Sequence, residues 1–227
     1  MICRSLPLFA VVACVPAEEE DAIPTTGLEA HVTVAAFDDI QAGVVMTLHE
    51  SAGLESDFYE LALDEEITVT IPGFVISLIA SKLDSQPVYT ASVPIPATDA
   101  DFIVSLNRDP PDKTADDSRV SLPLAFDLTA PGAFSRGSDD MEVTWSVFDQ
   151  ADPLTLEING PCIDTYQAEV SDIGAVVIPA GSVTGTGESC PAELTLTRQR
   201  FGTVDHAFGS GSVVAFQQRG LALTANP

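Results

Sequence analysis

The stretch LEAHVTVAAF (residues 28–37) alternates apolar with other residues at a period of two, as a half-buried β-strand does. Leu28, Ala30, Val32 and Val34 would share one face of that strand. Six similar short runs follow, separated by Gly, Pro, Asp and Ser, at 44–50, 57–63, 67–71, 74–80, 88–95 and 101–107. Seven such runs without an amphipathic helix period predict an antiparallel β-sandwich over residues 28–107.

A second group of strand-like runs follows near residue 120. These runs are 119–128, 141–148, 153–158, 175–181, 193–200 and 212–224, with loops expected at 131–140, 159–174 and 201–211. Between the groups, RDPPDKTADDSR (108–119) holds two prolines and no apolar anchor, so we expect a linker there. The sequence therefore predicts an all-β protein with a second sandwich over residues 120–227.

Two short stretches resemble strands of immunoglobulin-like and fibronectin type III domains. EVTWS (142–146) is similar to the second strand of such a domain, with Trp145 in its core. VYTASV (88–93) is similar to the sixth strand, which would place Tyr89 at the tyrosine corner, where the phenol bonds to backbone a few residues upstream. The resemblance implies two tandem immunoglobulin-like antiparallel β-sandwiches with Tyr89 and Trp145 as core residues.

The N-terminal residues have the pattern of a targeting signal. Arg4 precedes the apolar run LPLFAVVA (6–13), which is too short to span a bilayer as a helix but has the length of a signal-peptide core. The run ends at Cys14, and VVAC (11–14) resembles the lipobox of lipoprotein precursors of Gram-negative bacteria. A secretory signal cut at an ordinary small-residue site is the alternative.

The lipobox resemblance implies a signal peptide at 1–13, lipidation of Cys14 and an acidic tether over residues 14–27. Val15, which is not Asp, implies sorting to the outer membrane, so the membrane becomes a partner through the lipid anchor. Because Cys3 would leave with the signal and Cys14 would carry lipid, Cys162 and Cys190 remain as the one available pair. Export to an oxidising compartment then favours a disulfide between them.

The charge is strongly negative: 34 acidic residues stand against nine basic ones, for a net charge of −25. Such a surface repels phosphate backbones and anionic headgroups, so we expect no nucleic-acid partner and no peripheral membrane face. A solvated acidic surface without a specific ligand is the simplest interpretation.

Calcium is the one cofactor that the sequence suggests. Asp112, Asp116 and Asp117 in the expected linker are candidate ligands, because calcium sites use several carboxylates from flexible loops. The region contains no DxDxDG loop, and acidic residues in turns commonly cap the turn or contact water. The alternative is therefore that no cofactor is bound.

No nucleophile elbow, phosphate-binding loop or HExxH motif occurs in the sequence. We therefore expect a non-enzymatic binding, adhesion or envelope-scaffold role, with an envelope protein or a glycan as partner. Two alternatives stay open. One is a hydrolase or other enzyme with a site in the loops, and the other is an accessory subunit of an envelope complex.

Overall fold

The computed structural model describes residues 23–51, 57–94, 101–110, 112–147 and 152–227. Within these ranges the regular secondary structure consists of one short 3-10 helix, η1 (Thr25–Gly27), and β-strands, which turns and loops connect. The prediction of an all-β protein built from sandwiches is therefore confirmed. None of the helical structure in these ranges is long and apolar enough to cross a membrane.

The first sandwich consists of two facing sheets formed by the first eight strands. One sheet holds β1 (Leu28–Ala36), β2 (Gln41–Glu50), β6 (Gln86–Pro94) and β5 (Ile79–Leu83), in that spatial order. The other holds β4 (Phe74–Ser77), β3 (Glu66–Ile71), β7 (Asp101–Asn107) and β8 (Ala115–Ser121). These are the A-B-E-D and C′-C-F-G orders of an immunoglobulin-type sandwich, as the sequence predicted.

The alternation of apolar residues positions these strands. In β1 every second residue from Leu28 to Ala36 is buried, and the residues between them are only partly exposed. The buried faces of β2, β3 and β7 alternate in the same way and meet β1 in one hydrophobic core. Burial of this apolar surface, at roughly 25 cal/mol per Å², is the main force that holds the two sheets together.

In the described ranges the second sandwich also has eight strands, but they divide unequally between its two sheets. One sheet has the order β14 (Ala175–Ile178), β11 (Met141–Trp145) and β9 (Leu128–Thr129). The facing strands are β13 (Ile163–Val170), β12 (Leu154–Gly160), β15 (Cys190–Phe201) and β16 (Ser210–Asn226), and β10 (Ala133–Ser135) also pairs with β16. A separate hydrophobic core fills the space between these two sheets.

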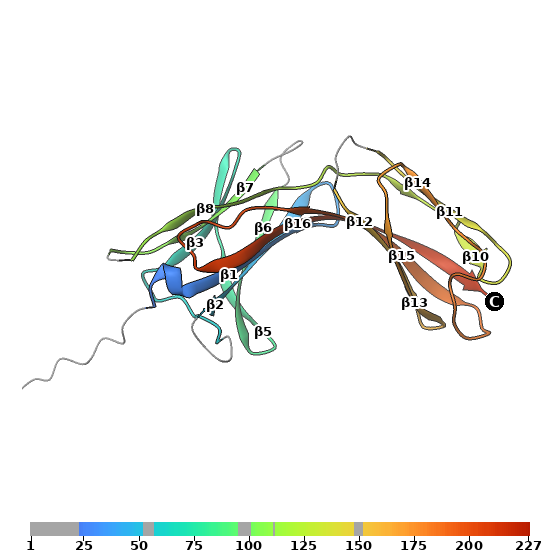
Figure 1. The fold of residues 1–227 in the computed structure, drawn as a ribbon, viewed down its shortest axis with the longest axis horizontal. Helices are drawn as coiled ribbons and strands as arrows, with labels where there is room; N and C mark the ends of the chain where they lie inside the picture. The colour runs from blue at the N-terminus through green and yellow to red at the C-terminus, as the bar shows by residue number, and fades with distance from the viewer. Residues whose placement is uncertain (1–22, 52–56, 95–100, 111, 148–151) are drawn as a thin grey trace, which may run out of the picture.

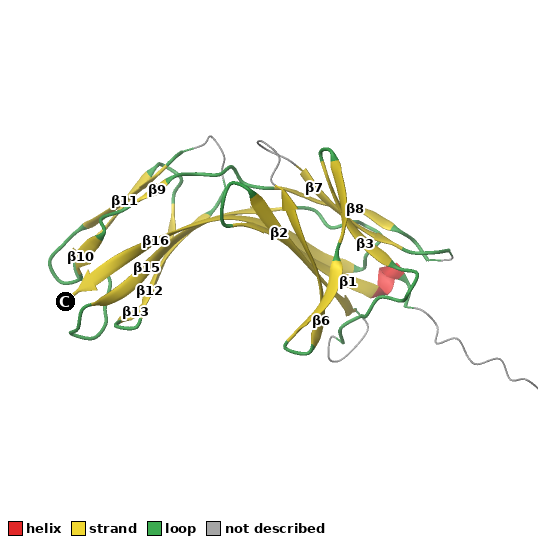
Figure 2. Cartoon of the chain, turned by 180° about the vertical axis from the view of Figure 1, so that it is seen from behind, coloured by secondary structure: helices red, strands yellow, loops and turns green. Residues whose placement is uncertain are grey.

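One sheet of nine strands runs through both sandwiches, which the sequence did not predict. In the 17-residue strand β16, residues 214–225 pair antiparallel with β15, and residues 210–217 pair parallel with β1. Figures 1 and 2 show this long sheet on the inner side of an arch, with the two smaller sheets on the outer side. The two sandwiches are therefore joined by shared backbone hydrogen bonds.

The expected linker at 108–119 is wrong, because most of it belongs to the first sandwich. Arg108 is buried, and residues 115–121 form β8, which pairs with β7. The sequence of β8 does not have the pattern of a buried strand, because its buried residues are Ala115, Ser118 and Val120 and its charged residues are not buried. The expected tether also ends earlier than residue 27, since Thr25 is buried.

The expected limits of the second domain also need correction. The turn after β15 and the start of β16 contribute Ala207, Phe208, Val213 and Ala215 to the core of the first sandwich. The backbone of Arg119 in β8 exchanges two hydrogen bonds with Thr203 in that turn. The C-terminal part of the chain therefore completes the first sandwich as well as the second.

Four local predictions differ from the structure. Residues 57–63 form no strand beyond a single bridge between Phe58 and His49. The run 74–80 divides at Leu78 into β4 and β5, which lie in different sheets. Strands β10 and β13 occupy segments that we expected to be loops.

Candidate functional site

A groove of about 480 Å³ opens at one edge of the first sandwich. It lies where the chain leaves the smaller sheet at the end of β4, passes through Leu78 and enters the long sheet at β5. Residues 60–66 form its other wall. Fourteen residues line it: Glu60, Leu61, Ala62, Leu63, Glu65, Glu66, Ile67, Ser77, Leu78, Ala80, Ser81, Lys82, Pro87 and Tyr89.

The floor of the groove is an extension of the hydrophobic core. Ile67, Leu78 and Tyr89 are buried members of that core, and each also lines the groove. The two sheets diverge here, because β4 and β5 are consecutive in sequence but pair with different neighbours. An apolar group placed in the groove would therefore contact the same surface that packs the sandwich.

The rim of the groove is mainly acidic. Glu60 and Glu66 line it, with Lys82 as the one basic lining residue. Lys82 Nζ lies 3.2 Å from Glu60 Oε1, and both side chains are about two-thirds exposed (67% and 64%). The Ser77 hydroxyl donates a hydrogen bond to Glu66. Exposed pairs of this kind add little stability, so they leave the acidic groups available to a ligand.

Exposed apolar side chains concentrate around the same edge. Of the twelve large hydrophobic residues that are exposed in the described ranges, five lie between residues 63 and 83. These are Leu63, Phe74, Val75, Ile79 and Leu83. A concentration of this kind is typical of an interaction surface.

Tyr89 is part of the core, as the sequence predicted, but its hydrogen bond differs from a tyrosine corner. The residue is 3% exposed, and its hydroxyl oxygen accepts a hydrogen bond from the backbone N–H of Leu61 at 2.8 Å. Leu61 is 28 residues upstream, whereas a tyrosine corner bonds within a few residues. Burial raises the pKa of the phenol. The bond fixes the 60–66 wall of the groove to strand β6.

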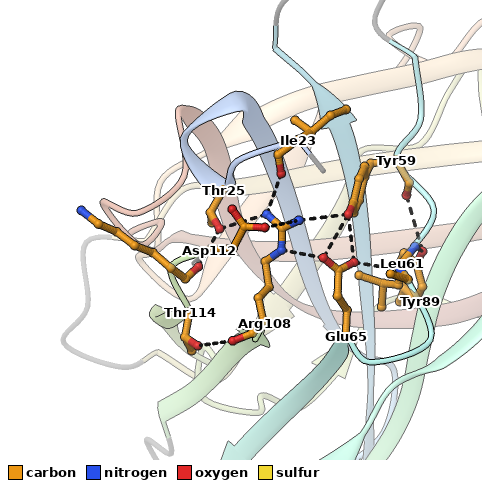
Figure 3. Close-up of polar contacts among 11 residues, drawn as sticks. Ile23, Thr25, Tyr59, Leu61, Glu65, Tyr89, Arg108, Asp112 and Thr114 are labelled. Carbon is orange, nitrogen blue, oxygen red and sulfur yellow. Dashed lines mark hydrogen bonds and ion pairs between the residues drawn. The ribbon is translucent and has the colours of Figure 1, made fainter. Parts of the chain in front are cut away.

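A second set of polar contacts holds the far side of that wall (Figure 3). Arg108, the residue directly after β7, donates through Nε to Glu65 Oε1 at 2.6 Å. Glu65 in turn accepts hydrogen bonds from the Tyr59 hydroxyl at 3.0 Å and from the backbone N–H of Ala62 at 2.9 Å. The side chains of Arg108 and Glu65 are 1% and 6% exposed, so this ion pair is almost completely desolvated.

Arg108 also binds the first residues that the structure describes. Its Nη1 donates to the Ile23 carbonyl at 2.7 Å and to Thr25 Oγ1 at 3.1 Å, and its Nη2 lies 3.2 Å from Asp112. Thr25 Oγ1 donates to the Lys113 carbonyl at 2.6 Å. One guanidinium therefore connects residues 23–25, the groove wall and the segment before β8.

Tyr59 completes the network as a donor that stays protonated. Burial, together with its hydrogen bond to Glu65, raises the pKa of the Tyr59 phenol to about 12. At neutral pH the hydroxyl therefore donates to Glu65 and accepts from Arg108 Nη2 at 3.1 Å. The wall is preorganised before any ligand arrives, which reduces the entropy that binding would cost.

Trp145, the other predicted core residue, is 6% exposed and lies in β11, the strand next to the first strand of the second sandwich. Its indole N–H donates to Asp172 Oδ1 at 2.7 Å, and Asp172 Oδ2 accepts from Arg198 Nη2 at 2.8 Å. Arg198 also donates to the carbonyls of Leu124 and Ser146. This network joins β11 to β15, and none of its residues lines the groove.

The predicted disulfide between Cys162 and Cys190 is present. It joins the turn between β12 and β13 to the start of β15, at the far end of the second sandwich. The carbonyl of Cys162 accepts a hydrogen bond from Arg136 Nη1 at 2.8 Å. Arg136 also donates to the carbonyls of Thr186, Glu188 and Asn226, so the disulfide and this arginine together hold the 181–189 loop.

The candidate calcium ligands do not form a cluster. Asp112 faces Arg108, and Asp117 pairs with Arg119. Asp116 lies on β8, where its carbonyl accepts a hydrogen bond from the Ser105 hydroxyl. In the ranges that the structure describes, no group of three or more His, Cys, Asp or Glu residues is arranged to hold a metal ion. Cys14, the predicted lipidation site, lies outside those ranges.

Comparison with known proteins identifies no family for this chain. No family model matches it, and no curated protein is similar to it in sequence. Among solved structures it is similar to a crystal structure of the chicken CNTN1 FN1-FN3 domains. The two are 13% identical with a TM-score of 0.24, over 86% of this chain and 67% of that chain.

Proposed function

We propose that this chain is a lipid-anchored, non-enzymatic binding protein of a bacterial envelope, and that it binds its partner in the groove of the first sandwich. The observation that carries the proposal is the groove itself: an opening of about 480 Å³ whose floor is formed by side chains of the hydrophobic core, with a preorganised wall. The anchor is supported by the resemblance of VVAC (11–14) to a lipobox.

The groove suits an extended segment of a partner protein that carries an apolar side chain next to Lys or Arg. Its apolar floor matches the apolar side chain, and Glu60 and Glu66 on its rim match the positive charge. Strand β5 also lines the groove and is the last strand of the long sheet. Such an edge can accept an added strand through backbone hydrogen bonds.

Fluorescence anisotropy with short labelled peptides tests the proposed binding. One peptide alternates Leu with Lys, and a second alternates Leu with Glu. We expect the first to bind and the second not to bind. Ala80→Phe, which fills the groove from an exposed position on β5, should weaken binding about tenfold or more.

The matched control is Ala133→Phe, the same exchange at an exposed position of β10 in the second sandwich. It should leave peptide affinity unchanged. Glu60→Gln together with Glu66→Gln should weaken binding and flatten its salt dependence. Equal affinity for the Lys and Glu peptides, or full affinity in the Ala80→Phe variant, would contradict the proposal.

Membrane fractionation tests the anchor separately. Cys14→Ser removes the thiol that would carry lipid, so the protein should move from the membrane fraction to the soluble fraction. Cys3→Ser is the matched control and should leave the protein in the membrane fraction. Membrane attachment of the Cys14→Ser variant would contradict the lipid anchor without affecting the groove proposal.

A further inference from the structure

The long sheet has one face that points away from both cores, and no partner has yet been assigned to this solvent-facing surface. Alternate residues of the strands contribute to it, and Figures 1 and 2 show that it lies on the inner, concave side of the arch. Near the centre of the sheet its side chains form two rows that cross five strands. Both rows follow from the strand registers.

The first row consists of residues that pair across β6, β2, β1, β16 and β15. Thr33 of β1 lies opposite Val45 of β2 and Val214 of β16. Val45 also lies opposite Thr90, and Val214 opposite Phe201. None of these five residues is buried, and none is charged.

The second row lies two residues further along the same strands. Ala35 of β1 lies opposite Gly43 of β2 and Phe216 of β16. Gly43 also lies opposite Ser92, and Phe216 opposite Gln199. This row is likewise neither buried nor charged.

The absence of charge in both rows contrasts with the rest of the chain. Charged residues make up 19% of the sequence, and the net charge is −25. A charged partner would meet no counter-charge within these rows. A second copy of the chain would carry the same net charge and be repelled at long range. The rows therefore suit an uncharged partner.

The chemistry of the rows combines hydrogen-bonding and apolar groups. Thr33, Thr90, Ser92 and Gln199 can each both donate and accept a hydrogen bond. Val45, Val214 and Phe216 present apolar surface between them. With strands about 4.8 Å apart, five strands give a surface about 19 Å wide. Sugar rings present hydroxyl groups and apolar C–H faces, which these side chains complement.

The small residues in the second row leave room for a chain to lie on the sheet. Ala35 and Gly43 are neighbours there, between Ser92 and Phe216. A Cβ atom added at Gly43 would meet only the Ala35 carbonyl oxygen, at 3.9 Å. The space above Gly43 is therefore open to solvent, and the ring of Phe216 lies beyond Ala35.

From these observations we infer that the solvent-facing surface of the long sheet binds an uncharged polysaccharide. The polymer lies across the two rows, with its hydroxyl groups bonded to the Thr, Ser and Gln side chains and its rings over Val45, Val214 and Phe216. This interaction is independent of the groove, because β5 and the 60–66 wall contribute to neither row.

Affinity gel electrophoresis tests this inference with the full chain and four neutral polymers: dextran, pullulan, galactomannan and hydroxyethyl cellulose. Alginate serves as the anionic comparison. We expect at least one neutral polymer to retard the protein and alginate not to do so. The retardation should change little with salt, in contrast to peptide binding in the groove.

Two substitutions at Gly43 locate the binding surface. Gly43→Gln and Gly43→Glu both extend into open space, so both should fold, and both should lower affinity about tenfold or more by filling the row. Val177→Gln and Val177→Glu, at an exposed position of β14 on the opposite side of the arch, are the matched controls and should bind normally. Phe216→Ala should also weaken binding.

Three results would overturn the inference. They are the absence of retardation by all four neutral polymers, full affinity in the Gly43→Gln variant, and a dimer in sedimentation that Gly43→Gln dissociates. The last result would assign this face to a second copy of the chain. Loss of peptide binding by Ala80→Phe with polymer binding intact would show that the two surfaces act separately.

Discussion

Val213 of the last strand lies opposite Val32 of the first, within the parallel pairing of β16 with β1. Eight residue pairs make up this pairing, and both valines belong to the core of the first sandwich. Parallel neighbours in a sheet ordinarily require a long connection, and here the connection is almost the whole chain. Without this pairing, β1 and residues 210–217 of β16 would each leave an unpaired strand edge, so each sandwich covers an edge of the other.

Gly211 provides a test of this pairing. Its φ is +151°, and a Cβ atom there would lie 2.0 Å from the Ala30 carbonyl oxygen. We expect Gly211→Ala to lower the free energy of unfolding by about 1–3 kcal/mol, because β1 and β16 must separate or the backbone must adopt a strained conformation. Urea denaturation measures this loss.

The control is Gly220→Ala on the same strand. There a Cβ atom would meet the flexible Glu193 side chain at 3.0 Å and the Leu194 carbonyl oxygen at an ordinary 3.9 Å, so the variant should be as stable as the original protein or slightly more stable. Equal stability of the Gly211→Ala variant and the original would contradict the observed packing of β16 on β1.

The shared sheet also predicts that both sandwiches unfold together. Trp145 is the only tryptophan and lies in the second core, so its fluorescence reports on that sandwich alone. Far-ultraviolet circular dichroism reports on the strands of both. The two signals should give the same urea midpoint, as a two-state transition requires. A fluorescence midpoint distinct from the dichroism midpoint would show that the sandwiches unfold independently.

Local patterns predicted much of this fold because the apolar alternation of β1, β3, β7, β11 and β12 depends only on which face is buried. They could not predict pairing between residues that are far apart in sequence. The pattern of β16 is that of an ordinary strand. Nothing in it indicates that residues 210–217 pair with β1 while residues 214–225 pair with β15.

The candidate site could not be predicted from the sequence, because its contacts also join residues that are far apart in the chain. Arg108 contacts Ile23 and Glu65, which are 85 and 43 residues away. Beside Pro110 and Asp112 it reads as part of a charged loop. The one available signal was a single arginine directly after an apolar strand, a position from which its side chain can bond to several neighbouring segments.

The pairing of Cys162 with Cys190, by contrast, was predictable, because the lipobox resemblance assigned the other two cysteines to the signal peptide and to the lipid.

The ion pair between Arg108 and Glu65 should be essential for stability. Arg108→Met would leave the Glu65 carboxylate buried and without this partner, at a cost of about 3–5 kcal/mol. The double variant Arg108→Met, Glu65→Gln should recover part of that loss, because no unpaired charge remains. Thermal denaturation of the three proteins checks this. A double variant less stable than Arg108→Met would contradict the interpretation.

The raised pKa of Tyr59 predicts a loss of stability at alkaline pH. In the unfolded chain a tyrosine ionises near pH 10, whereas Tyr59 in the folded protein has a pKa of about 12. Between these values the folded state binds more protons than the unfolded state, so stability falls as pH rises from about 10 to about 12. Below pH 10 the contribution is fully present.

Tyr59→Phe is the control for this pH dependence. It removes the titrating group, so the fall in stability over that interval should become shallower. Tyrosinate absorbance should lose the component with a midpoint near pH 12 in the same variant. Loss of a component with a midpoint near pH 10 instead would show that Tyr59 ionises at an ordinary pH, and so that its bond to Glu65 does not persist in solution.

The disulfide should stabilise the second sandwich and, through the shared sheet, the whole protein. Cys162 and Cys190 are 28 residues apart, and closing a loop of that size contributes about 3–4 kcal/mol in the chain-entropy model. Reduction should therefore lower the urea midpoint of both the Trp145 fluorescence and the dichroism signals. Cys162→Ala, Cys190→Ala should show the lower midpoint with or without reductant. If reduction moved only the fluorescence midpoint, β16 would not transmit stability from one sandwich to the other.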